Sequence, residues 1–192
     1  RKHERLNQTP IRLLHISRAD NSGGSARSAY KIHTGFRDLG HVSRMLVEIK
    51  VTSDPDVDTI HSNKLPLRIL DRLGREVVDR AGLQYMYYPS SFAMLNHEWV
   101  RSAQIVQLYN IHGGFFTHRV LPRLSRDHIV VWRLSDMWPL TGHCSYSYDC
   151  DRWQTGCGKC PLLNEYPSLT WDTTAFLWKM KQSIYAQSRI VM

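Results

Sequence analysis

The sequence lacks any apolar run long enough to cross a bilayer, and no signal peptide opens it. A membrane-spanning chain and a secreted one are therefore not expected. Charged residues make up 22% of the 192 residues and hydrophobic ones 42%, which is ordinary for a globular protein with a full core. These observations predict one soluble, cytoplasmic domain.

The sequence also lacks the common phosphate-binding signatures. It contains neither G-x-G-x-x-G nor G-x-x-x-x-G-K-[ST]. Basic residues outnumber acidic ones, 25 to 17, for a formal net charge of +8. Apart from a small cluster at residues 1–5, this excess is scattered and no nucleic-acid-binding motif accompanies it, so nucleic acid is not an expected partner. The charge favours only a phosphate-bearing ligand or an anionic membrane surface.

Short apolar runs alternate with helical patterns along the chain. Four runs of strand length predict buried strands, at residues 11–16, 42–49, 105–111 and 129–134. Apolar residues at three- and four-residue steps predict helices, most clearly over 26–39 and 67–83. This order predicts an α/β fold, a Rossmann-like parallel sheet with helices on both faces. We assign residues 1–10 to a flexible leader and 11–192 to the domain.

Other segments are less regular. Residues 50–64 are polar and predict a surface loop, and a short helix is expected near 97–102. The aromatic stretch 84–95 either packs beneath a loop or forms the wall of an acceptor cleft. A further strand is expected at 188–192, after one more helix.

Three loops follow predicted strands, at residues 17–25, 110–114 and 135–143. Ligands of parallel sheets bind outside the carboxyl ends of the strands, so these loops are expected to meet at one edge. Gly23 and Gly24 precede a predicted helix, whose free N–H groups and positive end attract phosphates. In the same turn, Arg27 either reaches a phosphate or is an ordinary surface arginine.

All four cysteines lie in one long loop, at residues 136–161. Cys144, Cys150, Cys157 and Cys160 have the spacing C-x5-C-x6-C-x2-C. Because no secretion signal is present, a tetrahedral zinc site is favoured over two disulfides. His143 is a candidate to replace one cysteine. A redox role is disfavoured, because the C-x2-C does not open a helix after a strand.

Longer motifs carry a resemblance to a known family. The residues ADNSGG-x-AR-x-AY, NIHGG, W-x-L-x-DMW-x-x-TGHC-x-YSYDC-x-RW-x-TGC-x-x-CP and YPSL-x-x-DTT resemble the amino-terminal half of GT-B glycosyltransferases. The chain is most similar to family 4 retaining transferases of bacterial exopolysaccharide clusters, such as those for colanic acid. The resemblance extends over residues 11–192.

The resemblance implies one half of a two-domain enzyme. The amino-terminal domain would hold a saccharide or lipid-linked saccharide acceptor. A carboxyl-terminal domain, absent from this chain, would bind the nucleotide-sugar donor. This fragment alone is then expected to be inactive. Transfer would be of the hexosyl type and retaining, without a catalytic metal, in the cytoplasm with peripheral contact at the inner face of the membrane.

The resemblance also implies roles for individual residues. The family's L-H-D after the fourth strand reads Leu134-Ser135-Asp136 here, so the sugar contact of that histidine falls to Ser135, Asp136 or His143. Asp136 alternatively caps the following turn. The catalytic candidates are Ser135, Asp136 and His112. The substrate-binding candidates come from the glycine loops and their neighbours: Gly23, Gly24, Arg27, Gly113, Gly114 and His143.

Two other classes of function stay open at this point. The chain also fits a stand-alone, zinc-stabilised module that binds nucleic acid or a saccharide, given its basic charge and four cysteines. A non-catalytic saccharide-binding Rossmann-like domain would have the same cleft but no donor partner.

Overall fold

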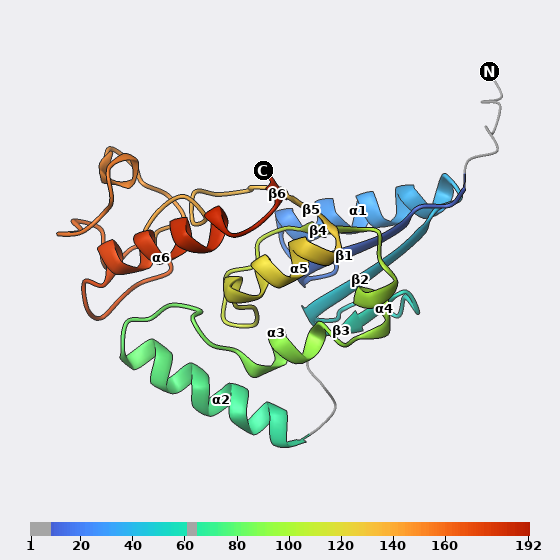
Figure 1. Cartoon of the computed structure of the whole chain (residues 1–192), viewed down its shortest axis with the longest axis horizontal. Coiled ribbons are helices and arrows are strands. Elements are labelled where there is room, and N and C mark those ends of the chain that lie inside the picture. Colours follow the sequence, from blue (N-terminus) through green and yellow to red (C-terminus); the bar gives the residue numbers. More distant parts are fainter. Residues whose placement is uncertain (1–8, 61–64) are drawn as a thin grey trace.

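The structure is a computed structural model that describes residues 9–60 and 65–192. Its described strands form one all-parallel sheet in the order β3-β2-β1-β4-β5-β6 (Figure 1). This confirms the predicted α/β, Rossmann-like fold class. The strands are β1 (Arg12–Ala19), β2 (Val42–Ile49), β3 (Val57–Thr59), β4 (Ile105–Leu108), β5 (Ile129–Trp132) and β6 (Ile190–Val191).

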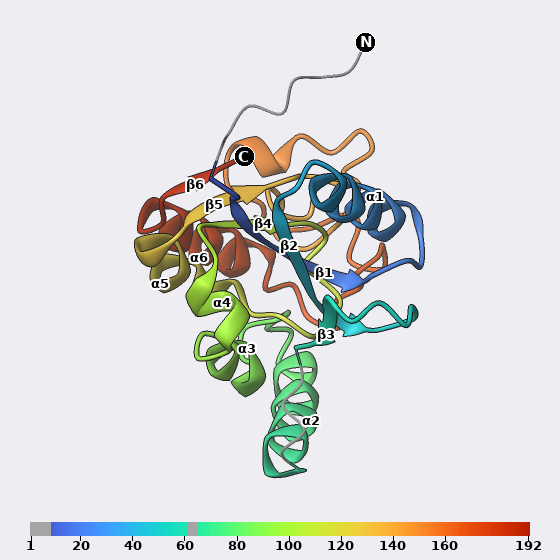
Figure 2. The ribbon, with the colours of Figure 1, turned by 90° about the vertical axis from the view of Figure 1, so that its right-hand side faces the viewer.

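Helices cover both faces of this sheet. Figure 2 shows α1 on one side and α3, α4 and α5 on the other, with α2 farthest from the strands. Two short 3-10 helices, His118–Val120 and Arg152–Gln154, lie in the loops. The α-helices are α1 (Gly24–Asp38), α2 (Leu65–Arg80), α3 (Pro89–Met94), α4 (Glu98–Ser102), α5 (Leu121–Asp127) and α6 (Thr174–Ala186).

The core lies on both sides of the sheet, because helices cover both faces of a parallel sheet. A small cluster beneath α1 joins Ala29 to Met45 and Val47 of β2. The larger cluster joins the other face of the sheet to the helices α3 to α6. Its largest fully buried side chains include Trp138, from the loop after β5, and Phe115, from the loop after β4. Loops from the carboxyl edge of the sheet are thus anchored in the core.

The strand register aligns the carboxyl ends of the central strands. Ile16 of β1 pairs with Leu108 of β4, which in turn pairs with Trp132 of β5. The strand order reverses between β1 and β4, since β2 and β3 lie on one side of β1 and β4 to β6 on the other. Such a switch point leaves a crevice at the carboxyl edge, where ligands of this fold class bind.

Most sequence-based boundaries agree with the structure, and a few differ. Residues 50–64, expected to be a loop, contain the edge strand β3, which pairs with β2. The irregular stretch 84–95 contains α3, which begins at a proline in its first turn. The strand expected at 105–111 ends at Leu108. The predicted leader lies mostly outside the described residues.

No helix in the described part of the chain is long and apolar enough to cross a membrane.

Candidate functional site

A cleft of about 490 Å³ lies at the carboxyl edge of the sheet. Its walls come from the end of β1 with the start of α1, from the loop after β4, and from the loop after β5. The three loops expected to meet therefore do line one cleft. Its lining includes Arg18, Gly23, Gly24, Ser25, Asn110, His112, Asp136, Ser145, Tyr146 and Tyr166.

Asp136 is the centre of the polar network in this cleft. Its Oδ2 accepts hydrogen bonds from His112 Nε2 at 2.7 Å and from Asn110 Nδ2 at 3.1 Å. Its Oδ1 accepts one from the backbone N–H of Trp138 at 3.0 Å. Asp136 thus both caps the turn after β5 and contacts His112, so the two roles considered for it from the sequence coexist.

The carboxylate of Asp136 fixes the position of the proton on the His112 ring. An ionised carboxylate only accepts hydrogen bonds, so Nε2 carries the proton and Nδ1 carries the lone pair. Nδ1 is buried and has no hydrogen-bond partner among the described residues. The His112 ring packs beside Trp138 and Tyr166, with centroid distances of 5.6 and 5.8 Å. His112 thus lines the cleft with a ring nitrogen that no described group of the protein engages.

The opposite wall of the cleft is the start of α1. Gly23 caps this helix with φ +84°, and no side chain caps it by hydrogen bonding. A Cβ atom on Gly24 would meet nothing within 4 Å, so the space beside it is open. The first-turn N–H groups of a 15-residue helix thus lie at the cleft with their positive end. This arrangement suits a phosphate or another anion.

Other candidates from the sequence lie around the cleft rather than on it. Arg27 is exposed in the first turn of α1 and is not among the lining residues. Ser135 bonds through its hydroxyl to Ser25 at 3.2 Å, which joins the end of β5 to the start of α1. Gly113 and Gly114, with φ of +116° and +86°, form the turn after β4.

These two glycines serve close packing. A Cβ on Gly113 would lie 3.2 Å from the Arg18 side chain, and one on Gly114 would lie 3.2 Å from the Tyr88 hydroxyl. Arg75 also donates a hydrogen bond to the Gly114 carbonyl. They therefore shape the loop that presents His112.

His143 lies at a second place, away from the cleft. Its Nδ1 donates a hydrogen bond to the Pro167 carbonyl at 2.9 Å, and its Nε2 lies 3.4 Å from Cys160 Sγ. Together with all four cysteines it lines a small cavity of about 20 Å³. The structure thus groups this histidine with the cysteines and not with Asp136.

The four cysteines are free thiols. Burial is the main cause that raises the pKa of Cys144, Cys157 and Cys160 above the usual thiol value. A redox or nucleophilic cysteine needs the opposite shift. Within the described residues, no three His, Cys, Asp or Glu side chains form a ready-made ligand set for a metal ion. Zinc binding therefore stays a prediction.

The sequence did not single out several cleft residues. Arg18 lies at the end of β1, where its guanidinium contacts Glu48 at 3.3 Å. Asn110 and Arg18 both follow apolar strand positions, and that placement was an available signal. Tyr146 lies in the cysteine loop and Tyr166 follows it. They are 62% and 56% exposed, and no pattern in the sequence pointed to their place in the cleft.

Comparisons with known proteins give a partial similarity. No family model matches the chain, and neither does a solved structure. The protein described as "Putative colanic acid biosynthesis glycosyl transferase WcaC", from Escherichia coli (strain K12), is 39% identical over 61 residues. The aligned part is 32% of this chain and only 15% of that protein. This local similarity supports a glycosyltransferase relationship.

Proposed function

We propose that this chain is the acceptor-binding part of a retaining GT-B glycosyltransferase of exopolysaccharide biosynthesis. The reaction moves a hexosyl group from a nucleotide-sugar to a saccharide or lipid-linked saccharide. The observation that carries the proposal is the cleft in which Asp136 orients His112 opposite the start of α1. The local similarity to a colanic acid transferase supports the same class of reaction.

The cleft has the size and chemistry that a sugar ligand needs. Its volume of about 490 Å³ lies within the range of small-molecule sites, about 300–1,000 Å³. Saccharides present hydroxyl groups and apolar ring faces. The unpartnered Nδ1 of His112 would accept a hydrogen bond from a sugar hydroxyl once the groups that bury it move aside. The exposed rings of Tyr146 and Tyr166 offer flat apolar surfaces for a sugar ring.

The start of α1 supplies the second part of the proposed chemistry. A nucleotide-sugar carries its anionic charge on the diphosphate, which gains negative charge as the glycosidic bond breaks. The uncapped N–H groups behind Gly23 and Gly24 would stabilise that charge. In a retaining reaction assisted by the leaving phosphate, the protein supplies positioning and charge stabilisation. His112 then acts as a residue that positions the acceptor hydroxyl.

The proposal includes peripheral contact with an anionic membrane surface. One exposed stripe of α2 carries four large apolar side chains that are each more than half exposed: Ile69, Leu70, Leu73 and Val77. Their helical spacing places them on one face, and the chain carries a net charge of +8. Sedimentation with anionic and with neutral vesicles tests this contact, and equal sedimentation with both would contradict it.

Acceptor binding tests the proposal at the level of this chain. Calorimetric titration with a series of saccharide fragments is expected to give binding that falls about fivefold to tenfold in His112→Ala, since a hydrogen bond contributes about 1–1.4 kcal/mol. His41→Ala is the matched control, because His41 precedes β2 at the amino edge of the sheet. Equal affinity of both variants would remove His112 from the site.

A further inference from the structure

We propose that Cys144, Cys150, Cys157 and Cys160 form a structural zinc site with four thiolate ligands. All four line the cavity of about 20 Å³, which has room for one ion but not for a larger group. Four thiolates in a tetrahedral arrangement are the donor set of structural zinc. This site is separate from the cleft and does not depend on the proposed transferase function.

The backbone around the last two cysteines already has the shape of a ligand-holding turn. Cys157, Gly158 and Lys159 have φ of +53°, +94° and +45°. Left-handed conformations of residues other than glycine cost about 1–2 kcal/mol each, and they persist where the surroundings over-determine them, as at ligand clamps. A metal ion bound to both Cys157 and Cys160 would supply that constraint.

Backbone N–H groups point at two of the sulfur atoms. Gly142 donates to Cys157 Sγ at 3.2 Å, and Leu162 donates to Cys160 Sγ at 3.4 Å. His143 Nδ1 donates to the Pro167 carbonyl, so its Nε2 carries the lone pair and lies 3.4 Å from Cys160 Sγ. This contact places His143 beside the proposed ligands.

The four cysteines line the cavity, but their sulfur atoms do not yet meet at one point. The side chains must therefore rotate inward to bind the ion. Binding releases the thiol protons to solvent, and no oxidant or reductant takes part.

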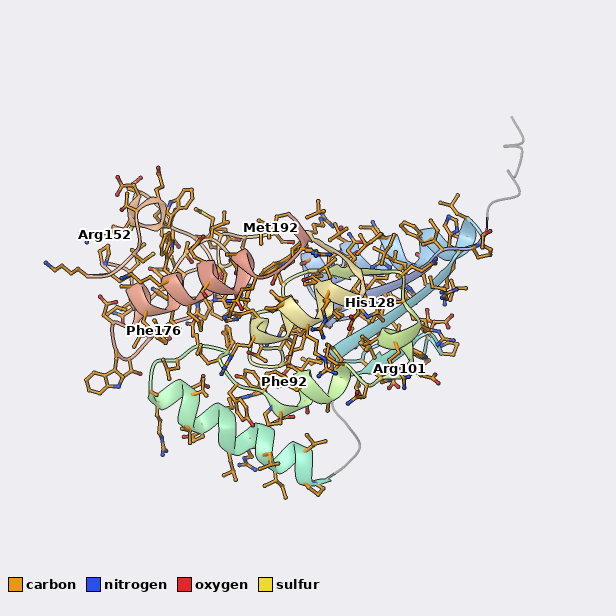
Figure 3. All side chains as sticks on the ribbon, in the orientation of Figure 1. Phe92, Arg101, His128, Arg152, Phe176 and Met192 are labelled. Carbon is orange, nitrogen blue, oxygen red and sulfur yellow. The ribbon has the colours of Figure 1, made fainter. Side chains whose placement is uncertain are left out.

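The zinc site would hold one wall of the cleft. The backbone N–H of Ser145, next to Cys144, donates to the Tyr166 carbonyl at 2.9 Å, and both residues line the cleft. Figure 3 shows Arg152, from the cysteine loop, and Phe176 of α6 at the same end of the molecule. At this junction a Cβ on Gly142 would lie only 2.6 Å from the Thr174 carbonyl oxygen. The metal would therefore lock the loop against α6.

The test is the metal content of the reduced chain, purified after incubation with Zn²⁺. Elemental analysis is expected to give one zinc per chain, and substitution by Co²⁺ to give thiolate-to-metal absorption bands. The apparent affinity is expected to fall at least about tenfold in Cys157→Ser, because even second-shell changes cost 10–100-fold. Gln154→Ala, an exposed change in the same loop, should keep the metal.

A second measurement does not depend on how the variants fold. Alkylation of wild-type protein denatured without reductant should modify four thiols, and chelator should lower the melting temperature. Reduced protein that binds no zinc, or purified protein with two disulfides and no alkylation, would overturn the proposal.

Discussion

Replacement of Asp136 by Asn is the most informative single change in the cleft. The wild-type carboxylate accepts three hydrogen bonds and its side chain is only 7% exposed. An amide offers one oxygen. If this oxygen keeps the Trp138 N–H, the amide NH₂ meets two groups that are themselves donors, His112 Nε2–H and the side chain of Asn110. His112 must then move its proton to Nδ1.

That proton shift changes what the cleft offers to a ligand. Nδ1 becomes a donor instead of an acceptor, and Asn110 keeps a partner only by turning its amide over to present its oxygen. A hydrogen bond to a charged group contributes about 1.5–3 kcal/mol, so Asp136→Asn is expected to destabilise the fold by about 2 kcal/mol. For a chain of this length that lowers the melting temperature by roughly 4–8 °C. In the intact enzyme, kcat/KM is expected to fall about 100-fold, equivalent to about 2.7 kcal/mol.

Calorimetry and initial-rate kinetics together check this expectation. Asp38→Asn is the matched control, since Asp38 is exposed at the last residue of α1, and surface changes usually stay within about 0.5 kcal/mol. If Asp136→Asn keeps wild-type kcat/KM and acceptor affinity, the orientation of His112 plays no part in function and the reasoning is refuted.

Two further changes probe separate parts of the structure. Gly24→Val should leave the melting temperature within about 2 °C, because a Cβ there meets nothing within 4 Å, but it should abolish transfer by filling the space beside α1; retained activity would remove that loop from the site. Burial lowers the pKa of His118 from 6.5 to about 3, so its stabilising effect is complete above pH 6.5 and is lost as the pH falls toward 3. At pH 5 His118 lowers the free energy of unfolding by about 2 kcal/mol relative to pH 7. Urea titrations at pH 5 and 7 should show that His118→Leu lacks this decrease. If the stability of that variant depends on pH as the wild-type stability does, the lowered pKa of His118 is contradicted.

The sequence predicted the sheet well because its strands are local apolar runs. The second strand was placed at 42–49 and β2 occupies Val42–Ile49. β3 was missed because it has three residues, of which only Val57 is buried, and it forms only by pairing with β2. α3 was missed because its six residues, PSSFAM, are too few to show a helical period.

The candidate site was partly predictable for a similar reason. Loops at the carboxyl ends of parallel strands must meet, so His112 and Asp136 were expected near each other. Their hydrogen bond was not predictable, because it depends on the β4–β5 register and on how each loop leaves its strand. His143 was assigned to the cleft from the resemblance, but the turn that follows Trp138 takes it to the cysteine cavity.

The central claim is tested most directly by sugar transfer. The intact natural protein, incubated with a panel of labelled nucleotide-sugars and a saccharide or lipid-linked saccharide acceptor, is expected to transfer label from at least one donor. The His112→Ala variant should lose most of this transfer and His41→Ala should keep it. If the wild-type protein binds the acceptor but transfers label from no donor, the account is contradicted, and a non-catalytic saccharide-binding domain takes its place.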